Sequence, residues 1–424
     1  MQNKEITVVG LGYIGLPTAV VMAEAGHQVK GYDAKSEVRE CLKAGSIHIV
    51  EQGLQEAYEN VTQKGNLIIT DEAAPADIYV ICVPTPFLET EGEKRADLTY
   101  VEEASINVAK LLKKGDLVIL ESTVPPHTTA HVTKILADVS GLPKETFFTA
   151  HCPERVLPGK ILYELTHNDR IIGSEDMKAA QMTKELYETF VSGGTCYVCD
   201  DVTAELCKLA ENTYRDINIA YANQLSAICR ESGIDVFRLI ELANKHPRVN
   251  ILTPGLGVGG HCLAVDPWFI VEKYGEKASL IRTAREINER KPLWVTEEID
   301  KALEEDKKPF KSQTIDVRGS RAKRVGIMGM AYKPDIDDMR ESPSLCLAHA
   351  LEKAGYDTAG YEPNSSEEEV EGISLRPLTY ILDTSDYLVI ALGHKELQET
   401  WVKERMKQIP HYDCIGLLRE EINE

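Results

Sequence analysis

The sequence contains no apolar run that approaches the roughly 20 residues of a membrane-spanning helix. The chain enters a strand pattern at once, with MQNKEITVVGLG, and shows no signal-peptide architecture.

Basic residues are also scarce. The 47 Lys and Arg face 68 Asp and Glu, and the formal net charge of −21 argues against sequence-independent binding to nucleic acid or anionic membrane. We therefore expect a cytoplasmic protein that makes only local positive contacts with any anionic ligand.

The ten cysteines lack the spacing of a disulfide framework, and we expect most of them to be small buried apolar residues. Cys196 and Cys199 form a C-x-x-C pair, but no second pair follows at zinc-site spacing. Two His-Cys dipeptides, at 151–152 and 261–262, would make a zinc-dependent alcohol dehydrogenase only if adjacent side chains pointed to one ion. Neighbours in an extended chain point to opposite faces, so the sequence favours no bound metal. It assigns no role to the C-x-x-C pair.

The length of 424 residues predicts two or three domains. The first opens with an apolar run at 6–9, the turn GLGYIG, and a helix-like segment that ends at Gly26. Gly10, Gly12 and Gly15 fit the dinucleotide fingerprint, in which they serve the tight turn, the backbone approach to pyrophosphate and the packing of helix on strand. The phosphates would lie at the N-terminus of the helix.

The next predicted strands point to NAD. QVKGYD ends at Asp33, at the roughly 20-residue spacing where a carboxylate accepts from a ribose hydroxyl, which favours NAD over NADP. Two further strands, in IYVICVPTP and DLVILESTVPPHTT, stop at Thr85, Ser122 and Thr123. Ligands of parallel sheets lie beyond the carboxyl ends of strands, so these hydroxyls would line the cofactor cleft. The alternative is that they only cap helices.

The same order of strand, glycine turn and helix returns from residue 324, where AGYDTAGYE echoes AGHQVKGYD. Met330 and Ala331 follow Gly329 and break the second fingerprint, so we expect a different nucleotide-shaped ligand here. Lys333 and Arg340 are candidate partners for its phosphate or carboxylate. The alternative for these charges is a solvated surface loop.

A long helical pattern covers 203–232 and places Lys208, Asn212 and Arg215 at i, i+4 and i+7 on one face. Spacing alone leaves open whether this face is solvated or lines a site. The charged stretch EEDKKPFKSQ then marks a domain boundary. We expect an α/β protein with two Rossmann-like, doubly wound parallel-sheet domains joined by a central helical domain. The predicted domains are 1–198, 199–304 and 305–424.

The segment GLGVGGHCLAVDPWF, at 255–269, places Cys262 behind four glycines. Such a loop lets backbone and substrate come close to a thiolate nucleophile. A dinucleotide dehydrogenase needs such a thiol when it oxidises an alcohol beyond the aldehyde, because the thiol must add before a second hydride can leave. The thiohemiacetal then becomes a thioester, which water hydrolyses to the acid. The segment therefore predicts a four-electron oxidation with two NAD per turnover.

The chain resembles the UDP-glucose/GDP-mannose dehydrogenase family over essentially its full length. The resemblance rests on ordered motifs: GLGYIGLP, VPTP, ESTVPP, HCPERVLPG, KLAENTYR, GVGGHC and YKPDIDDMRESPS. Within the family, GVGGHCLAVDPWF, HPRVN and PERVLPG are similar to the branch that oxidises UDP-N-acetyl-D-mannosamine at C6. Enzymes for UDP-N-acetylglucosamine share the G-G-H-C loop. UDP-glucose enzymes typically differ at His261 and carry Lys where this chain has Val265.

The resemblance implies a role for each residue of the reaction site. Cys262 would be the nucleophile, and Lys208 would handle the proton or stabilise oxyanions. A nearby ammonium lowers the pKa of a thiol and holds a developing oxyanion. Asn212 would donate to the same oxygen, Asp266 would accept a proton through water, and Glu154 would serve thioester hydrolysis. Because these groups are present, the sequence disfavours a non-catalytic sugar-nucleotide sensor.

The resemblance also implies the ligand contacts and a homodimer or higher homo-oligomer built on the central helix. Arg248 would reach a neighbouring subunit, and the cations of the site would offset a diphosphate. The NAD contacts would be Gly10, Gly12, Tyr13, Ile14, Gly15, Asp33, Thr85, Ser122, Thr123 and Arg340. The UDP-sugar contacts would be Arg155, Val156, Lys208, Asn212, Arg215, His246, Arg248, Gly259, Tyr332 and Lys333.

Overall fold

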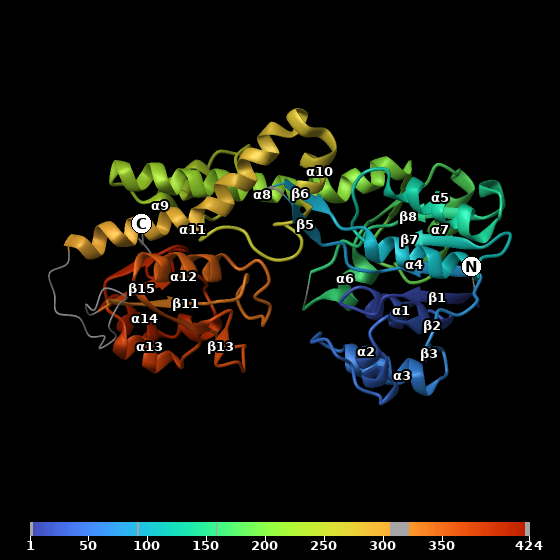
Figure 1. The fold of residues 1–424 in the computed structure, drawn as a ribbon, viewed down its shortest axis with the longest axis horizontal. Helices are drawn as coiled ribbons and strands as arrows, with labels where there is room; N and C mark the ends of the chain where they lie inside the picture. The colour runs from blue at the N-terminus through green and yellow to red at the C-terminus, as the bar shows by residue number, and fades with distance from the viewer. Residues whose placement is uncertain (1–2, 91–92, 158, 306–321, 420–424) are drawn as a thin grey trace. The chain divides into compact units, whose positions relative to one another are not determined.

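The computed structural model describes residues 3–90, 93–157, 159–305 and 322–419. The chain divides into two compact units, Met1–Glu211 with Trp268–Gly275, and Asn212–Pro267 with Glu276–Glu424. Figure 1 shows their helices and strands. The expected boundary stretch EEDKKPFKSQ begins in the last turn of α11 (Ser279–Glu305), and its other residues lie outside the described part of the chain.

The first unit is built on an eight-stranded sheet with the order β10-β9-β8-β7-β4-β1-β2-β3. Neighbouring strands run parallel, except that β8 and β9 pair antiparallel. The strands are β1 (Glu5–Val9), β2 (Gln28–Tyr32), β3 (Leu67–Ile69), β4 (Ile78–Ile81), β7 (Leu117–Leu120), β8 (Phe148–His151), β9 (Arg170–Gly173) and β10 (Cys196–Cys199). The expected Rossmann-like fold is confirmed for this part of the chain.

Strands buried on both faces explain the continuous apolar runs in the sequence. In β4, Ile78 and Val80 pack into one cluster with α1, α3, α6 and α7, while Tyr79 and Ile81 pack into another with α4 and α5. The helices of this unit are α1 (Gly15–Glu24), α2 (Ser36–Lys43), α3 (Leu54–Gln63), α4 (Thr99–Ala109), α5 (Thr128–Ser140), η1 (Lys144–Thr146), α6 (Ile161–His167) and α7 (Met177–Tyr187). The hairpin β5 (Phe87–Thr90) and β6 (Glu93–Ala96) lies outside the sheet.

One long helix, α8 (Asp201–Ser232), confirms the helix expected at 203–232. It is followed by α9 (Val236–Ala243), α10 (Asp266–Tyr274), η2 (Gly275–Ala278) and α11. A buried polar network joins α8 to α11: Arg285 donates to Asp216 Oδ1 at 2.7 Å, and Asn288 donates to the same oxygen at 2.8 Å. Asn223 donates to Asn288 Oδ1 at 2.9 Å. Such a buried network fixes the register of the two helices.

The last part of the chain forms a four-stranded parallel sheet with the order β12-β11-β15-β16. The succession β11-α12-β12 repeats β1-α1-β2, which confirms the second Rossmann-like fold. Ser342 caps α12 through its hydroxyl, and Pro343 opens the helix. The elements are β11 (Arg324–Met328), α12 (Pro343–Ala354), β12 (Asp357–Tyr361), β13 (Glu369–Val370), β14 (Ile373–Ser374), α13 (Leu378–Thr384), β15 (Tyr387–Ile390), η3 (Lys395–Gln398), α14 (Thr400–Lys407) and β16 (His411–Asp413).

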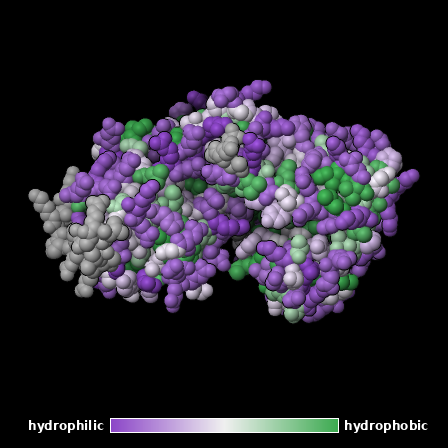
Figure 2. Space-filling model, in the orientation of Figure 1, coloured by the Kyte–Doolittle hydropathy of each residue, from purple (hydrophilic) through white to green (hydrophobic). Residues whose placement is uncertain are grey.

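Within the residues that the structure describes, no helix has both the length and the apolar character needed to cross a membrane. On the face drawn in Figure 2, hydrophilic residues predominate and hydrophobic ones form small separate patches.

Candidate active site

The turn between β1 and α1 needs each of its glycines for a different reason. Gly10 has φ +90°, and a Cβ there would lie 2.5 Å from the Cys82 carbonyl oxygen. A Cβ on Gly15 would lie 1.8 Å from the Gly10 carbonyl oxygen. Among the described residues, no atom outside Gly12 and its two chain neighbours lies within 4 Å of a Cβ on Gly12, so this position is open toward a ligand. This is the division of roles that a pyrophosphate-binding turn requires.

Asp33 directly follows β2 and is held at this turn by backbone groups. The Leu11 N–H donates to Asp33 Oδ2 at 2.8 Å, and the Lys35 N–H donates to Oδ1 at 2.9 Å. The side chain of Asp33 is only half-buried. Next to it, Tyr13 is exposed and Ile14 half-buried at the start of α1. The carboxylate and the open Gly12 therefore fit the ribose and phosphates of a dinucleotide.

The three predicted hydroxyl residues lie after neighbouring strands, Thr85 after β4, and Ser122 and Thr123 after β7. Thr85 Oγ1 donates to the Thr123 carbonyl at 2.6 Å, and Ser122 Oγ donates to the Val83 carbonyl at 2.7 Å. These bonds tie the two strand ends together, and no side-chain cap is made at the first residue of α4 or α5. The hydroxyl oxygens of Thr85 and Ser122 keep acceptor capacity toward a ligand.

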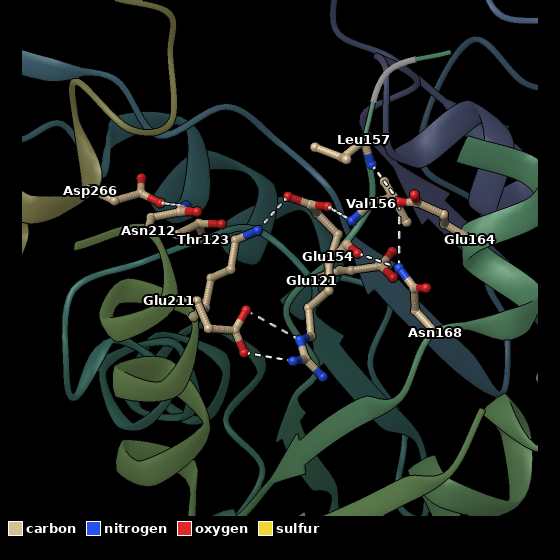
Figure 3. Close-up of polar contacts among 12 residues, drawn as sticks. Glu121, Thr123, Glu154, Val156, Leu157, Glu164, Asn168, Glu211, Asn212 and Asp266 are labelled. Carbon is tan, nitrogen blue, oxygen red and sulfur yellow. Dashed lines mark hydrogen bonds and ion pairs between the residues drawn. The ribbon is translucent and has the colours of Figure 1, made fainter. Parts of the chain in front are cut away.

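A buried ion pair joins Glu154 to Lys208. Lys208 Nζ donates to Glu154 Oε1 at 3.0 Å, and the two side chains are 8% and 11% exposed (Figure 3). The second carboxylate oxygen accepts from the Val156 N–H at 2.8 Å, so the loop after β8 orients the acid. A desolvated ammonium–carboxylate pair of this kind can hold an oxyanion or exchange a proton.

Arg155 is expected to contact the substrate. In the structure, its guanidinium pairs with a carboxylate of α8. Arg155 NH2 lies 2.8 Å from Glu211 Oε1, and Nε donates to Oε2 at 3.2 Å (Figure 3). Arg155 NH1 also donates to the Asp169 carbonyl at 3.0 Å. Glu211 was not predicted as a site residue, although it directly precedes Asn212 in the KLAENTYR motif.

Asn212, Asp266 and Cys262 are connected by hydrogen bonds. Asn212 Nδ2 donates to Asp266 Oδ2 at 2.5 Å, and both side chains are buried (Figure 3). The backbone N–H groups of Asp266 and Val265 both donate to the Cys262 carbonyl, at 2.8 and 3.0 Å. This turn places the acid that begins α10 directly behind the half-buried cysteine.

The glycine loop before Cys262 packs against the segment that follows β11. A Cβ on Gly259 would lie 2.3 Å from the Glu341 carbonyl oxygen, and a Cβ on Gly260, with φ +83°, would lie 2.8 Å from the Tyr332 ring. The Gly260 N–H donates to the Arg340 carbonyl at 3.1 Å. Contacts within the protein therefore require these two glycines, whereas the sequence suggested only closeness to a substrate.

His261 takes part in a charged group with Arg340 and Asp338. Arg340 donates to both oxygens of Asp338, the shortest contact being 2.6 Å, and Arg340 NH2 lies 3.1 Å from His261 Nδ1. Hydrogen bonds to Asp338 raise the pKa of Arg340, and the charges of Tyr332 and Cys262 act in the same direction. The Asp338 contact therefore keeps the Arg340 guanidinium charged beside His261.

Four other predicted substrate contacts are exposed. Arg215 lies on α8, and His246 and Arg248 lie on the loop after α9, where the Arg248 N–H donates to His246 Nδ1 at 3.3 Å. Asn218 fixes this loop to α8, because its side chain bonds to the backbone of Asn250 and Leu252. Lys333 is exposed in the segment after β11. The charges of Arg215, Arg248 and Lys333 are thus available to an anionic ligand.

The C-x-x-C pair forms β10. Cys196 is buried in the sheet core, and Cys199 Sγ donates to the Ile172 carbonyl at 3.7 Å. Both are free thiols. Among the described residues, no group of three or more His, Cys, Asp and Glu side chains is arranged to hold a metal ion.

Three models of one protein family match the chain in order. Residues 4–191 match the NAD binding domain of the UDP-glucose/GDP-mannose dehydrogenase family, residues 202–290 its central domain, and residues 326–420 its UDP binding domain. Together they cover most of the sequence, including every predicted site residue.

Individual relatives are similar over nearly the full length. The UDP-N-acetyl-D-mannosamine dehydrogenase of Methanocaldococcus jannaschii is 44% identical over 416 residues, which cover 96% of this chain and 89% of that one. The NDP-N-acetyl-D-galactosaminuronic acid dehydrogenase of Ralstonia solanacearum is 43% identical, with 93% and 92% covered. The solved structure of UDP-D-ManNAc dehydrogenase from Pyrococcus horikoshii matches with a TM-score of 0.87 at 37% identity, covering 98% of this chain and 96% of that one.

Proposed function

Because the chain belongs to the UDP-glucose/GDP-mannose dehydrogenase family, we propose that it oxidises the C6 alcohol of UDP-N-acetyl-D-mannosamine to the carboxylate. Family membership makes it an NAD-dependent oxidoreductase with a UDP-binding domain. The sugar is inferred from relatives of that specificity, at 42–44% identity. The observation that supports the chemistry best is the hydrogen-bonded set of Asn212, Asp266 and Cys262.

NAD supplies the hydride acceptor for each of the two oxidations. On this chain, Gly10, Gly12 and Gly15 would hold its pyrophosphate, and Asp33 would accept from a ribose hydroxyl. Tyr13, Ile14, Thr85, Ser122, Thr123 and Arg340 are the other proposed cofactor contacts. Asp33 is already oriented by the N–H groups of Leu11 and Lys35, so little reorganisation is needed when the ribose binds.

Cys262 would attack the aldehyde that the first oxidation leaves on C6. The S–C bond forms as the carbonyl oxygen takes a proton, which gives a thiohemiacetal, and loss of hydride from that carbon gives a thioester. Water then cleaves the thioester to the carboxylate and returns the thiol.

Lys208 would stabilise the alkoxide and oxyanion forms of the C6 oxygen, and Asn212, one helical turn along α8, would donate to the same oxygen. Glu154 would serve as the base for the hydrolytic water, with its carboxylate oriented by Val156 N–H. Asp266 would accept a proton through water. The proposed contacts to the UDP-sugar are Arg155, Val156, Arg215, His246, Arg248, Gly259, Tyr332 and Lys333.

The decisive measurement is the NADH formed per UDP-sugar consumed. The panel comprises UDP-N-acetylmannosamine, UDP-N-acetylglucosamine, UDP-N-acetylgalactosamine and UDP-glucose. The galactosamine sugar is included because of the relative from Ralstonia solanacearum. We expect two NADH per molecule of UDP-N-acetylmannosamine and the highest kcat/KM for that sugar. A ratio of one would contradict the four-electron reaction, and a preference for another sugar would overturn the substrate assignment alone.

The role of Cys262 is tested by Cys262→Ser, with the exposed Cys346→Ser as the matched control. We expect the first variant to bind NAD and UDP-sugar but to form no acid, because serine is a far weaker nucleophile at neutral pH. The control should turn over like the unmodified protein. Acid production by Cys262→Ser at the normal rate would remove the thiol from the mechanism.

The homodimer is supported by an exposed apolar stripe on α8. Tyr214, Tyr221 and Ile228 are 64%, 50% and 54% exposed and recur every seven residues, as at a helix–helix seam. Charge in this stripe should dissociate the dimer, so we expect Tyr221→Glu to sediment as a monomer. Tyr163→Glu, at an even more exposed tyrosine on α6 (63%), should remain dimeric. A monomeric unmodified protein would refute the proposal.

We propose three domains and a cytoplasmic location for the protein. We retain 1–198 for the NAD-binding domain, 199–304 for the central domain and 305–424 for the UDP-sugar-binding domain, bounds that fit the three matched segments. We also retain the cytoplasm as the location, because a reducing compartment keeps ten free cysteines as thiols. Fractionation of cells that express the protein would test this location.

A further inference from the structure

A cavity lies between the C-terminal half of α8, α11 and β16. Its volume is about 260 Å³, and the groups on its wall include Ser226, Arg230, Lys291 and Tyr412. For comparison, a cavity of roughly 150 Å³ holds a benzene molecule, and drug-sized ligands occupy about 300–1,000 Å³. The cavity therefore has room for a small metabolite or ion.

Lys291 is a buried cation on this wall, with a residue exposure of 5%. Its Nζ donates to Ser226 Oγ at 2.6 Å and lies 3.7 Å from the centre of the Trp294 ring. Within the described part of the chain, no carboxylate lies at ion-pair distance from this Nζ. A buried ammonium normally has such a partner, so the charge of Lys291 is under-compensated.

The same imbalance affects the titration of Lys291. Burial lowers its pKa to about 8, and the attractions of Cys414 and Glu298 only partly oppose this effect. Ser226 provides no further compensation, because its hydroxyl donates to the Asn223 carbonyl at 2.7 Å. An anion in the cavity would supply the missing charge.

The two carboxylates on the cavity wall make contacts with groups other than Lys291. Asp413 accepts from the backbone N–H groups of Ile415, Gly416 and Leu418. Asp235 caps α9 at the Phe237 N–H and pairs with an arginine near the end of the described chain, at 2.9 Å. Neither is within ion-pair distance of Lys291, so neither pairs with its ammonium group.

Arg230 adds a second cation at the rim, with a side chain that is 52% exposed. Its Nε donates to Glu298 Oε2 at 3.1 Å, and its guanidinium lies over the Tyr412 ring. Its two terminal nitrogens make no hydrogen bond to the described residues. They are therefore available to the oxygens of a ligand, in the fork geometry that suits carboxylate and phosphate.

We propose that this cavity binds a small anion through carboxylate or phosphate oxygens, which Lys291 contacts at the base and Arg230 at the rim. The site is separate from the reaction site: Ser226 lies 14 residues along α8 from Asn212, which is about 21 Å at 1.5 Å per residue. The anion binds independently of NAD and the UDP-sugar.

Thermal unfolding of the full chain without NAD or UDP-sugar tests this site. Inorganic phosphate and acetate are titrated separately against sodium chloride at constant ionic strength. We expect a saturable rise in Tm of about 1–3 °C with at least one of the two anions. The anion that acts at the lower concentration identifies phosphate or carboxylate as the preferred group. No rise beyond that in chloride would overturn the proposal.

Lys291→Met removes the charge and keeps much of the apolar stem, and it should abolish the saturable rise. Lys301→Met is the matched control on α11, since Lys301 is an exposed lysine paired with Glu298, and it should keep the rise. A rise that persists in Lys291→Met would place the anion elsewhere and contradict the proposal.

A labelling measurement covers the case in which Lys291→Met does not fold. The unmodified protein is treated with an amine-acylating reagent at pH 8, and peptide mass spectrometry reports the acylated fraction of Lys291. We expect phosphate or acetate to protect Lys291 and to leave Lys301 unaffected. Equal labelling of Lys291 with and without both anions would refute occupancy of the cavity.

Discussion

The two Rossmann-like halves of the chain begin alike and use their acidic residue differently. The Gly10 N–H donates to the Tyr32 carbonyl at 2.8 Å, and the Gly329 N–H donates to the Tyr361 carbonyl at 2.9 Å. Both glycines have positive φ, +90° and +98°. In both halves a carboxylate follows the second strand, Asp33 after β2 and Glu362 after β12. The backbone scaffold is therefore the same up to this acid.

Asp33 and Glu362 differ in how far their carboxylate oxygens remain accessible to a ligand. Asp33 is half-buried and accepts two backbone N–H groups at the turn. Glu362 has a fully buried side chain: its Oε2 accepts from the N–H groups of Met330 and Ala331 at 2.9 Å and lies 3.2 Å from His394 Nε2. In the second half, the carboxylate of Glu362 is therefore occupied by hydrogen bonds to its own turn. This explains why a repeated scaffold need not bind a second dinucleotide.

The largest effect is expected from Gly15→Ala. The second half has no counterpart to this glycine at the start of α12. The new Cβ would lie 1.8 Å from the Gly10 carbonyl oxygen, so the turn must distort. We expect the free energy of unfolding, measured in urea, to fall by at least about 3 kcal/mol. In the control Gly12→Ala, the new Cβ meets no described residue beyond its two chain neighbours within 4 Å. This variant should keep its stability but bind NAD more weakly. Equal stability losses in both variants would disprove this division of roles.

The paired variants Glu362→Gln and Asp33→Asn test the two acids directly. We expect Glu362→Gln to lower the free energy of unfolding by about 1–3 kcal/mol, because the buried partners lose a charged acceptor. Asp33→Asn should change stability little but raise the KM for NAD about tenfold or more, since a hydrogen bond to a charged group is lost. Unfolding in urea and NAD kinetics measure the two effects. If Asp33→Asn unfolds more easily than Glu362→Gln, the comparison fails.

Lowering the pH should destabilise the second Rossmann-like half, because Glu362 becomes protonated. Burial raises its pKa, but the His394 contact and the backbone N–H groups outweigh burial and hold the pKa below its ordinary value of 4.5. A carboxyl whose pKa is lower in the folded state contributes stability above pH 4.5, and this contribution disappears as the pH falls through the folded pKa. We expect Glu362→Gln to flatten the acid limb of the stability profile. An acid limb equally steep in both proteins would contradict this assignment.

The smallest effect concerns the segment 332–341, which the first half lacks. Asp338→Asn should cost less than about 1 kcal/mol of stability, because the Arg340 side chain is 59% exposed. It should lower kcat/KM roughly fivefold, because Arg340 loses the partner that orients it toward His261. Unchanged kinetics would limit Asp338 to a structural role.

Much of the site was predictable because its signals are local. Gly10, Gly15 and Asp33 lie at spacings that a strand, a turn and a helix impose, and the 3.6-residue period placed Lys208 and Asn212 on one face of α8. The pairing of Arg155 with Glu211 was not predictable, because 56 residues separate them and either side chain could have faced solvent.

The sequence by itself determined the two nucleotide folds, the long helix between them and the thiol chemistry of Cys262, since each follows from periodicity, short spacing or ordered motifs. The tertiary structure decided why Gly259 and Gly260 are glycines, how His261 meets Arg340, and why Lys291 faces a cavity with no carboxylate partner among the described residues. These features depend on segments tens of residues apart that pack within a few ångströms. Side-chain packing and burial set that geometry, and no local pattern in the chain records it.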